Sequence, residues 1–190
     1  MRTFIAIELP KTIRDSLAQL EEQLKKSGAD VKWVEPQNIH LTLKFLGEID
    51  EQKLDKIAEI TKNVASNRKT LYMRISSIGA FPKISTPRII WVGINEGYSE
   101  IKEIAKELEE RLVKLGIPKE NRPFSSHITL GRTRSALNRE KLIQELISAE
   151  NILNTENLEF PVTKITLFRS TLNSSGPIYE VLKAADLKTI

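Results

Sequence analysis

The sequence predicts a mixed α and β fold in which one structural unit occurs twice, and three observations support this. Strand-like and helix-like hydrophobic patterns alternate along the chain. The order of these patterns in the first half recurs in the second. The chain has two histidines, His40 and His127, and both start the same short pattern, in "HLTL" and "HITL". We therefore expect a single domain over residues 1–190, made of two pseudo-repeats of about 1–86 and 87–190.

The first half contains alternating apolar strands and amphipathic helices. Pro10 ends the first strand, Gly28 is placed to end the first helix, and Asp50 is a suitable N-cap for the second helix. A loop runs from Phe81 to Pro87. The predicted strands cover 3–9, 39–46 and 70–78, and the predicted helices cover 13–24 and 54–64.

The second half repeats this order and adds a closing strand. Ser99 and Asn138 are suitable N-caps, and Gly116 is placed to end the first helix of this half. The predicted strands cover 88–94, 127–130, 160–170 and 177–184, and the predicted helices cover 101–115 and 142–147.

The spacing between the helix-ending glycine and the histidine is nearly the same in both halves, which supports a true repeat. His40 follows Gly28 by 12 residues, and His127 follows Gly116 by 11. The helices after the two histidine strands open similarly, with "DEQKL" and "NREKL". Each repeat therefore places the pattern H-x-T-L on its second strand.

Each H-x-T-L strand presents an imidazole beside a hydroxyl. Side chains at positions i and i+2 of a strand point to the same face, so His40 lies beside Thr42 and His127 beside Thr129. The intervening apolar residues face the core. Both strands are thus half core and half candidate site.

Two histidines and two hydroxyls, related by pseudo-two-fold symmetry, suit chemistry at a phosphodiester. In-line displacement at phosphorus needs one proton removed and another delivered on the opposite side, and histidine does either near neutral pH. The hydroxyls of Thr42 and Thr129 can hydrogen-bond the non-bridging oxygens, where charge develops. This chemistry needs no metal and no cofactor.

Other uses of the two histidines fit less well. A metal site normally has three or four ligands, and the chain lacks cysteine, H-x-x-H and H-x-x-E, so carboxylates from elsewhere would have to complete it. A Ser-His-Asp hydrolase would use one histidine only, and no G-x-S-x-G is present. A purely structural, hydrogen-bonded histidine in each strand is the remaining alternative.

Cations and aromatic residues near the two strands are candidate substrate contacts. Lys44 has the parity of His40, so an ideal strand would turn it to the same face. Arg132 has the opposite parity, but Gly131 permits a bulge that would re-aim it. Trp33 and Phe124 precede the two strands and are candidates for stacking on a base, with core packing as the alternative.

Composition excludes several classes of protein. The absence of cysteine excludes disulfides, thiolate metal sites and cysteine nucleophiles. The net charge of +4 is compatible with a polyanionic partner without requiring one. The N-terminal segment lacks the hydrophobic region of a signal peptide, and no segment approaches the roughly 18 apolar residues of a membrane span. We expect a cytoplasmic monomer without membrane contact.

The motifs and their flanks resemble the 2H phosphoesterase superfamily, specifically the RNA 2′,3′-cyclic phosphodiesterases that are also called 2′-5′ RNA ligases. The resemblance covers nearly the whole chain. It is carried by "RTFIAIELP", "KWVEPQNIHLTLKFLGE", "GAFPKISTPRIIWVGI", "RPFSSHITLGR" and "TLFRSTLNSSGPIYEVL".

This resemblance implies a bilobal α+β fold, in which antiparallel sheets line a V-shaped cleft and helices lie outside. It implies that His40 is the proton donor and His127 the proton acceptor when a 2′,3′-cyclic phosphate is opened to a 2′-phosphomonoester. Arg132, in the extended pattern H-x-T-L-x-R, would hold the phosphate. One departure is Ser126, which stands where relatives often have proline before the second histidine, so the approach of His127 is less constrained.

The expected substrate is RNA with a 2′,3′-cyclic phosphate end, including tRNA fragments or nucleotides. Reverse 2′-5′ ligation in the same site is a further implied activity. The alternative function, from a different class, is a non-catalytic RNA- or nucleotide-binding module that uses the same cleft. The presence of both histidines favours catalysis, because binding needs cations and stacking rather than a proton donor and acceptor.

Overall fold

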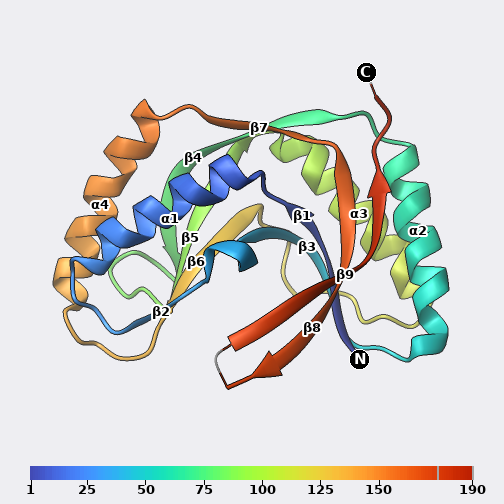
Figure 1. Ribbon diagram of the computed structural model, residues 1–190, viewed down its shortest axis with the longest axis horizontal. Helices are drawn as coiled ribbons and strands as arrows, with labels where there is room; N and C mark the ends of the chain where they lie inside the picture. The colour runs from blue at the N-terminus through green and yellow to red at the C-terminus, as the bar shows by residue number, and fades with distance from the viewer. Residues whose placement is uncertain (175, 190) are drawn as a thin grey trace.

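A computed structural model describes residues 1–174 and 176–189 of the chain (Figure 1). The strands are β1 (Arg2–Glu8), β2 (Val31–Trp33), β3 (His40–Glu48), β4 (Leu71–Phe81), β5 (Ile89–Glu96), β6 (His127–Thr133), β7 (Leu158–Val162), β8 (Lys164–Asn173) and β9 (Gly176–Asp186). The helices are α1 (Lys11–Lys25), α2 (Leu54–Ser66), α3 (Tyr98–Val113) and α4 (Arg139–Thr155), with short 3₁₀ turns η1 (Pro36–Asn38) and η2 (Glu51–Lys53).

Two antiparallel sheets form the framework. One has four strands in the order β3-β1-β8-β9, and the other has five in the order β2-β6-β5-β4-β7. The strands that begin with the two histidines, β3 and β6, lie next to each other where the sheets meet. The α+β class and the antiparallel sheets are therefore confirmed.

The two sheets do not correspond to the two halves of the sequence. Strand β4 of the first half joins β5 and β6 of the second half, whereas β8 and β9 join β1 and β3 of the first half. The chain passes from one sheet to the other at Thr163, between β7 and β8. The single strand predicted over 160–170 is therefore wrong, because its two parts belong to different sheets.

Helices cover the sheets on the side away from the two histidines. Helices α2 and α3 pack together, with α2 against β8 and β9 and α3 against β3 (Figure 1). Helices α1 and α4 pack together on the other side of the molecule, and α4 covers β4 (Figure 1). The main hydrophobic core lies under these helices and includes the apolar residues of both H-x-T-L strands.

Several local predictions changed in the structure. Asp50 caps the 3₁₀ turn η2 that leads into α2, since its side chain accepts a hydrogen bond from the Gln52 amide. Asn138 does not cap α4 with its side chain, which instead donates to the carbonyl of Gly28 at 2.9 Å. Ser99 lies inside α3, which begins at Tyr98. Within the described residues, none of the helices has the length and hydropathy of a membrane span.

Candidate active site

The two histidines begin their strands, and the predicted alternation holds around both. Leu41 and Leu43 on β3, like Ile128 and Leu130 on β6, are buried in the main core. The histidines and threonines between them are only partly buried. We call the surface formed by His40, Thr42, His127 and Thr129 the site face.

Both imidazole rings are held by the same backbone contact. The Nδ1 atom of His40 lies 2.7 Å from the carbonyl oxygen of Asn38, and Nδ1 of His127 lies 2.8 Å from that of Ser125. A carbonyl only accepts, so Nδ1 carries the hydrogen in each ring. The lone pair of the neutral imidazole is therefore on Nε2, the atom left for proton transfer.

The segment before His40 is itself fixed. Asn38 is buried, and its side-chain amide donates to the carbonyl of Pro177 in β9 at 2.9 Å. The residue whose carbonyl orients His40 is thus tied to β9, the strand at the opposite edge of the same sheet. No matching side-chain contact is present at Ser125 among the residues described, so His40 has the more rigid support.

The two Nε2 atoms differ in their contacts. Nε2 of His40 lies 3.0 Å from the hydroxyl of Thr42, which can donate to a neutral ring or accept from a protonated one. Within residues 1–174 and 176–189, Nε2 of His127 has no hydrogen-bond partner. In that same part of the chain, no three His, Cys, Asp or Glu side chains are grouped so as to hold a metal ion.

Burial lowers the pKa of both histidines below 6.5. For His40, removal from water has the largest effect, and its hydrogen bond to Asn38 acts in the opposite direction. For His127, burial is again the main cause, the bond to Ser125 opposes it, and the positive charge of Arg132 lowers the pKa further. Both rings are thus biased toward the neutral form when the site is empty.

A β-bulge brings Arg132 to the site face, as the glycine before it suggested. In the pairing of β5 with β6, Trp91 opposes Thr129 and Ile90 opposes Gly131, so Leu130 is the extra residue. After this extra residue, the side chains alternate in the opposite sense, so Arg132 points to the face that carries His127 and Thr129. In agreement with this, the positive charge of Arg132 lowers the pKa of His127. The same charge acts on Tyr179 of β9, in the other sheet.

An equivalent bulge in β3 turns Lys44 away from the site, so the prediction for this residue is wrong. Here Ala6 opposes Thr42 and Ile5 opposes Lys44, which makes Leu43 the extra residue. Lys44 is 3% exposed. Its position corresponds to that of Gly131 in β6, on the core side of the sheet.

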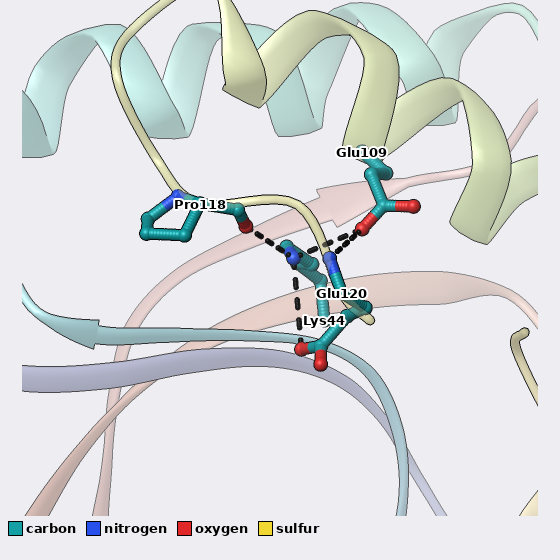
Figure 2. A network of polar contacts seen from close by, with 4 residues as sticks. All are labelled: Lys44, Glu109, Pro118 and Glu120. Atoms are coloured by element: carbon teal, nitrogen blue, oxygen red, sulfur yellow. Dashed lines mark hydrogen bonds and ion pairs between the residues drawn. The ribbon is translucent and has the colours of Figure 1, made fainter. Parts of the chain in front are cut away.

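Lys44 has a structural role on the helix side (Figure 2). Its Nζ atom donates to Glu109 of α3 at 3.1 Å and to the carbonyl of Pro118 at 2.8 Å, and it lies 3.6 Å from Glu120. Glu109 also accepts a hydrogen bond from the Glu120 amide at 2.7 Å. The cation therefore connects β3 to α3 and the loop after it.

Aromatic rings that sequence reasoning missed surround His40. Phe4, Phe168 and Tyr179 form an apolar cluster with Ala6 that is separate from the main core. The ring centroids of Phe4 and Tyr179 lie 4.9 and 5.2 Å from that of His40. The sequence did contain a signal for a second apolar cluster. Consecutive residues of β1 are apolar, so both faces of the strand carry apolar side chains, which is typical of a strand buried on both faces.

His127 has its own aromatic neighbours. The ring centroid of Phe81 lies 5.1 Å away at a right angle, and that of Trp91 lies 6.5 Å away. Trp91 covers Gly79, where an added Cβ would come within 2.4 Å of the indole. Its indole nitrogen is buried and has no partner in the described chain.

Trp33 and Phe124, the predicted stacking residues, do not make these contacts. Both are partly buried and pack against the main core. Trp33 pairs with Gly131, and its ring would lie 3.0 Å from a Cβ placed there. The structure thus favours the core-packing alternative for both residues.

Phe45 is a further candidate site residue that sequence reasoning missed. It follows the bulge of β3 as Arg132 follows the bulge of β6, so the two occupy equivalent positions of the repeat. Phe45 is 59% exposed, and its ring centroid lies 6.2 Å from that of Phe4 beside His40. One sheet thus presents an aromatic ring where the other presents a guanidinium.

Comparison with known proteins identifies the family of the chain. A family model described as LigT-like phosphoesterase matches the chain twice, over residues 7–91 and 92–179. The chain is 38% identical to an RNA 2′,3′-cyclic phosphodiesterase of Methanocaldococcus jannaschii, covering 96% of this chain and 99% of that protein. It is 34% identical to the protein of the same name from Methanothermobacter thermautotrophicus, covering 94% and 95%.

Solved structures show the same fold. TT0787 of Thermus thermophilus superposes with a TM-score of 0.81 at 28% identity, covering 98% of both chains. Escherichia coli LigT, in its complex with 3′-AMP, superposes with a TM-score of 0.77 at 25% identity, covering 98% of this chain and 97% of LigT. With its twin histidine strands and matches over nearly its whole length, the chain belongs to the LigT-like phosphoesterase family.

Proposed function

We propose that this protein is an RNA 2′,3′-cyclic phosphodiesterase that acts without a metal ion or cofactor. The observation that carries the proposal is the pair of H-x-T strands. Each holds a histidine by Nδ1 and leaves Nε2 for proton transfer, and each has a partly buried threonine two residues further along the strand; the hydroxyl of Thr42 lies 3.0 Å from Nε2 of His40. The names of the relatives support the same activity and an RNA substrate.

In the proposed reaction, water attacks the phosphorus of the cyclic phosphate. His127 takes the proton of the attacking water, and His40 gives a proton to the departing 3′ oxygen. One bond forms between phosphorus and the water oxygen, and the bond to the 3′ oxygen breaks. The products are a 2′-phosphomonoester and a free 3′ hydroxyl, while Thr42 and Thr129 donate to the non-bridging oxygens.

The charges around the two rings support this order of roles. A base must be neutral before the reaction, and Arg132 disfavours the charged form of His127. No cation is among the causes that lower the pKa of His40. A bound phosphodiester anion next to His40 would raise its pKa and so favour the protonated form that a donor needs.

Within the same proposal, Arg132 binds the phosphate and Phe45 stacks on the terminal base. A guanidinium makes charge-assisted hydrogen bonds to phosphate, and an exposed aromatic ring stacks on any base. Phe45 takes this role in place of Trp33 and Phe124, whose rings pack on the core.

The test is product analysis with an oligonucleotide ending in a 2′,3′-cyclic phosphate, in the presence of a chelator. We expect a 2′-phosphate product from the wild type and a loss of at least about a hundredfold in kcat from His40→Ala and His127→Ala. Loss of activity on chelation, or full activity of either folded variant, would refute the mechanism. Binding of 2′-phosphate RNA without turnover would instead identify an RNA-binding module.

The pH dependence gives a second readout. Both histidine pKa values are lowered in the free enzyme, so kcat/KM should peak below pH 6.5. The bound phosphate raises the pKa of His40, so kcat should peak at a higher pH than kcat/KM. Coincident profiles would contradict the assignment of His40 as the donor.

Finer points of the proposal need separate measurements. Supplying an RNA with a 5′ hydroxyl as acceptor tests 2′-5′ ligation, which would give a linkage resistant to 3′-5′-specific nucleases. Comparing tRNA fragments with cyclic mononucleotides tests the range of substrates. Light scattering tests the proposed monomer, and cell fractionation tests the proposed cytoplasmic location.

A further inference from the structure

A basic concavity lies beyond the end of β6, outside the site face. It has a volume of about 410 Å³ and is lined by side chains from the loop before β5, the loop after β6 and the start of α4. Its charged residues are Arg88, Arg134 and Arg139, all exposed. Thr86, Thr133 and Ser135 also line it.

The three arginines have no counter-ions within the described chain. Arg68, Arg74, Arg111 and Arg169 each form an ion pair with a glutamate. None of the residues described forms an ion pair or hydrogen bond with the guanidinium of Arg88, Arg134 or Arg139. An adjoining concavity, which shares Arg139, is lined by the carboxylate of Glu140. Three unneutralised cations around one concavity favour an anion with several charges.

The backbone that carries two of these arginines is fixed. The amide of Thr133 donates to the carbonyl of Arg88 at 3.1 Å, and its hydroxyl donates to that of Pro87 at 2.7 Å. The amide of Arg134 donates to the carbonyl of Asp30 at 2.8 Å. The loops around the concavity are thus tied together before any ligand binds, which lowers the ordering cost of binding.

The concavity continues the line of functional groups along β6. This strand carries His127, Thr129 and Arg132 in turn, and its last residue, Thr133, lines the concavity. At about 3.3 Å per residue, the six residue steps from His127 to Thr133 place the concavity roughly 20 Å from His127. That distance is too long for the phosphate of one nucleotide, but several linked nucleotides span it.

We propose that the concavity formed by Arg88, Arg134 and Arg139 binds backbone phosphates of the RNA strand on the 5′ side of the reacting end. The inference rests on the proposed function. A 2′,3′-cyclic phosphate ends its strand, so all remaining phosphates lie on its 5′ side. The ligand is a single-stranded phosphodiester backbone, bound without regard to base sequence.

The test compares a cyclic mononucleotide with a cyclic-phosphate oligonucleotide long enough to reach the concavity. The triple variant Arg88→Gln, Arg134→Gln and Arg139→Gln should lower kcat/KM for the oligonucleotide at least about tenfold at low salt. Its kcat/KM for the mononucleotide should stay within about twofold, because that substrate carries no upstream phosphate. The slope of log kcat/KM against log salt for the oligonucleotide should fall by about 2.

A matched control removes three exposed cations elsewhere. Lys56→Gln, Lys62→Gln and Lys106→Gln change the net charge equally, on helices α2 and α3, and should leave both substrates unaffected. Equal losses on the two substrates, or no loss on the oligonucleotide, would overturn the inference. If the wild type opens neither substrate, the proposed function fails instead, and fluorescence anisotropy with a 2′-phosphate oligonucleotide then decides whether the three arginines bind RNA.

Discussion

Glu21 is a buried carboxyl group on α1, and replacing it with glutamine should remove a pH-dependent loss of stability. The residue is 2% exposed, and its Oε1 atom has no partner among the described residues. Burial raises its pKa to about 8, with smaller increases from Glu22 and Glu35 and an opposing effect of Lys25. The folded protein therefore keeps this group protonated at neutral pH.

The sign and size of the effect follow from proton binding. Between the ordinary pKa of 4.5 and the raised value of about 8, the unfolded chain has lost this proton while the folded protein retains it. The free energy of unfolding therefore falls as the pH rises through this window, by up to about 1.4 kcal/mol per pH unit. At pH 7 the accumulated loss is on the order of 3 kcal/mol.

Urea unfolding of the wild type and Glu21→Gln across this pH range measures the loss. The variant has no proton to lose, so its advantage over the wild type should grow by about 3 kcal/mol between about pH 4.5 and pH 7. Glu22→Gln, at an exposed neighbouring position, is the control and should show no such growth. A stability difference that is constant with pH would refute the reasoning.

Three further predictions concern the two bulges. Lys44→Ala should lower the free energy of unfolding by about 3 kcal/mol, because it leaves Glu109 without its buried partner, while kcat of the folded enzyme stays unchanged. Gly131→Ala should lower the free energy of unfolding by about 1–3 kcal/mol, because the added Cβ would lie 2.7 Å from the Val31 side chain. The strand must then shift, which should also weaken phosphate binding by Arg132. Phe45→Ala should lower kcat/KM about tenfold for a cyclic nucleotide but leave kcat/KM for a base-free ribose cyclic phosphate unchanged. Equal losses on the two substrates would exclude stacking. Tyr72→Ala, which removes another exposed aromatic ring, is the control and should change neither value.

The sequence was sufficient for the local geometry of the histidine strands. Alternation with period two correctly predicted that His40 and Thr42 share one face while Leu41 and Leu43 enter the core. This worked because side-chain direction in a regular strand depends only on parity. The glycine at position 131 also identified the bulge that re-aims Arg132, since a residue without a Cβ fits against β2 there.

What the sequence did not reveal depends on pairing between distant segments. The bulge in β3 has no glycine to mark it, so parity placed Lys44 on the wrong face. The exchange of β4 and β8 between the sheets is equally invisible in a linear pattern, and it brings Phe168 and Tyr179 beside His40. The aromatic neighbours of a histidine belong to other strands, and local spacing cannot identify them.

The two bulges explain how a symmetric pair of strands can serve an asymmetric substrate. Each bulge turns the third residue after its threonine back toward the site face, so the fold provides two equivalent contact positions. One is occupied by Arg132, whose charge reaches both His127 and Tyr179 across the sheets. The other is occupied by Phe45, next to the apolar cluster around His40. Under the proposed function, we therefore expect a nucleotide to bind with its phosphate toward Arg132 and its base toward Phe45, in one of the two pseudo-symmetric orientations. That orientation would place the attacking water at His127 and the leaving oxygen at His40.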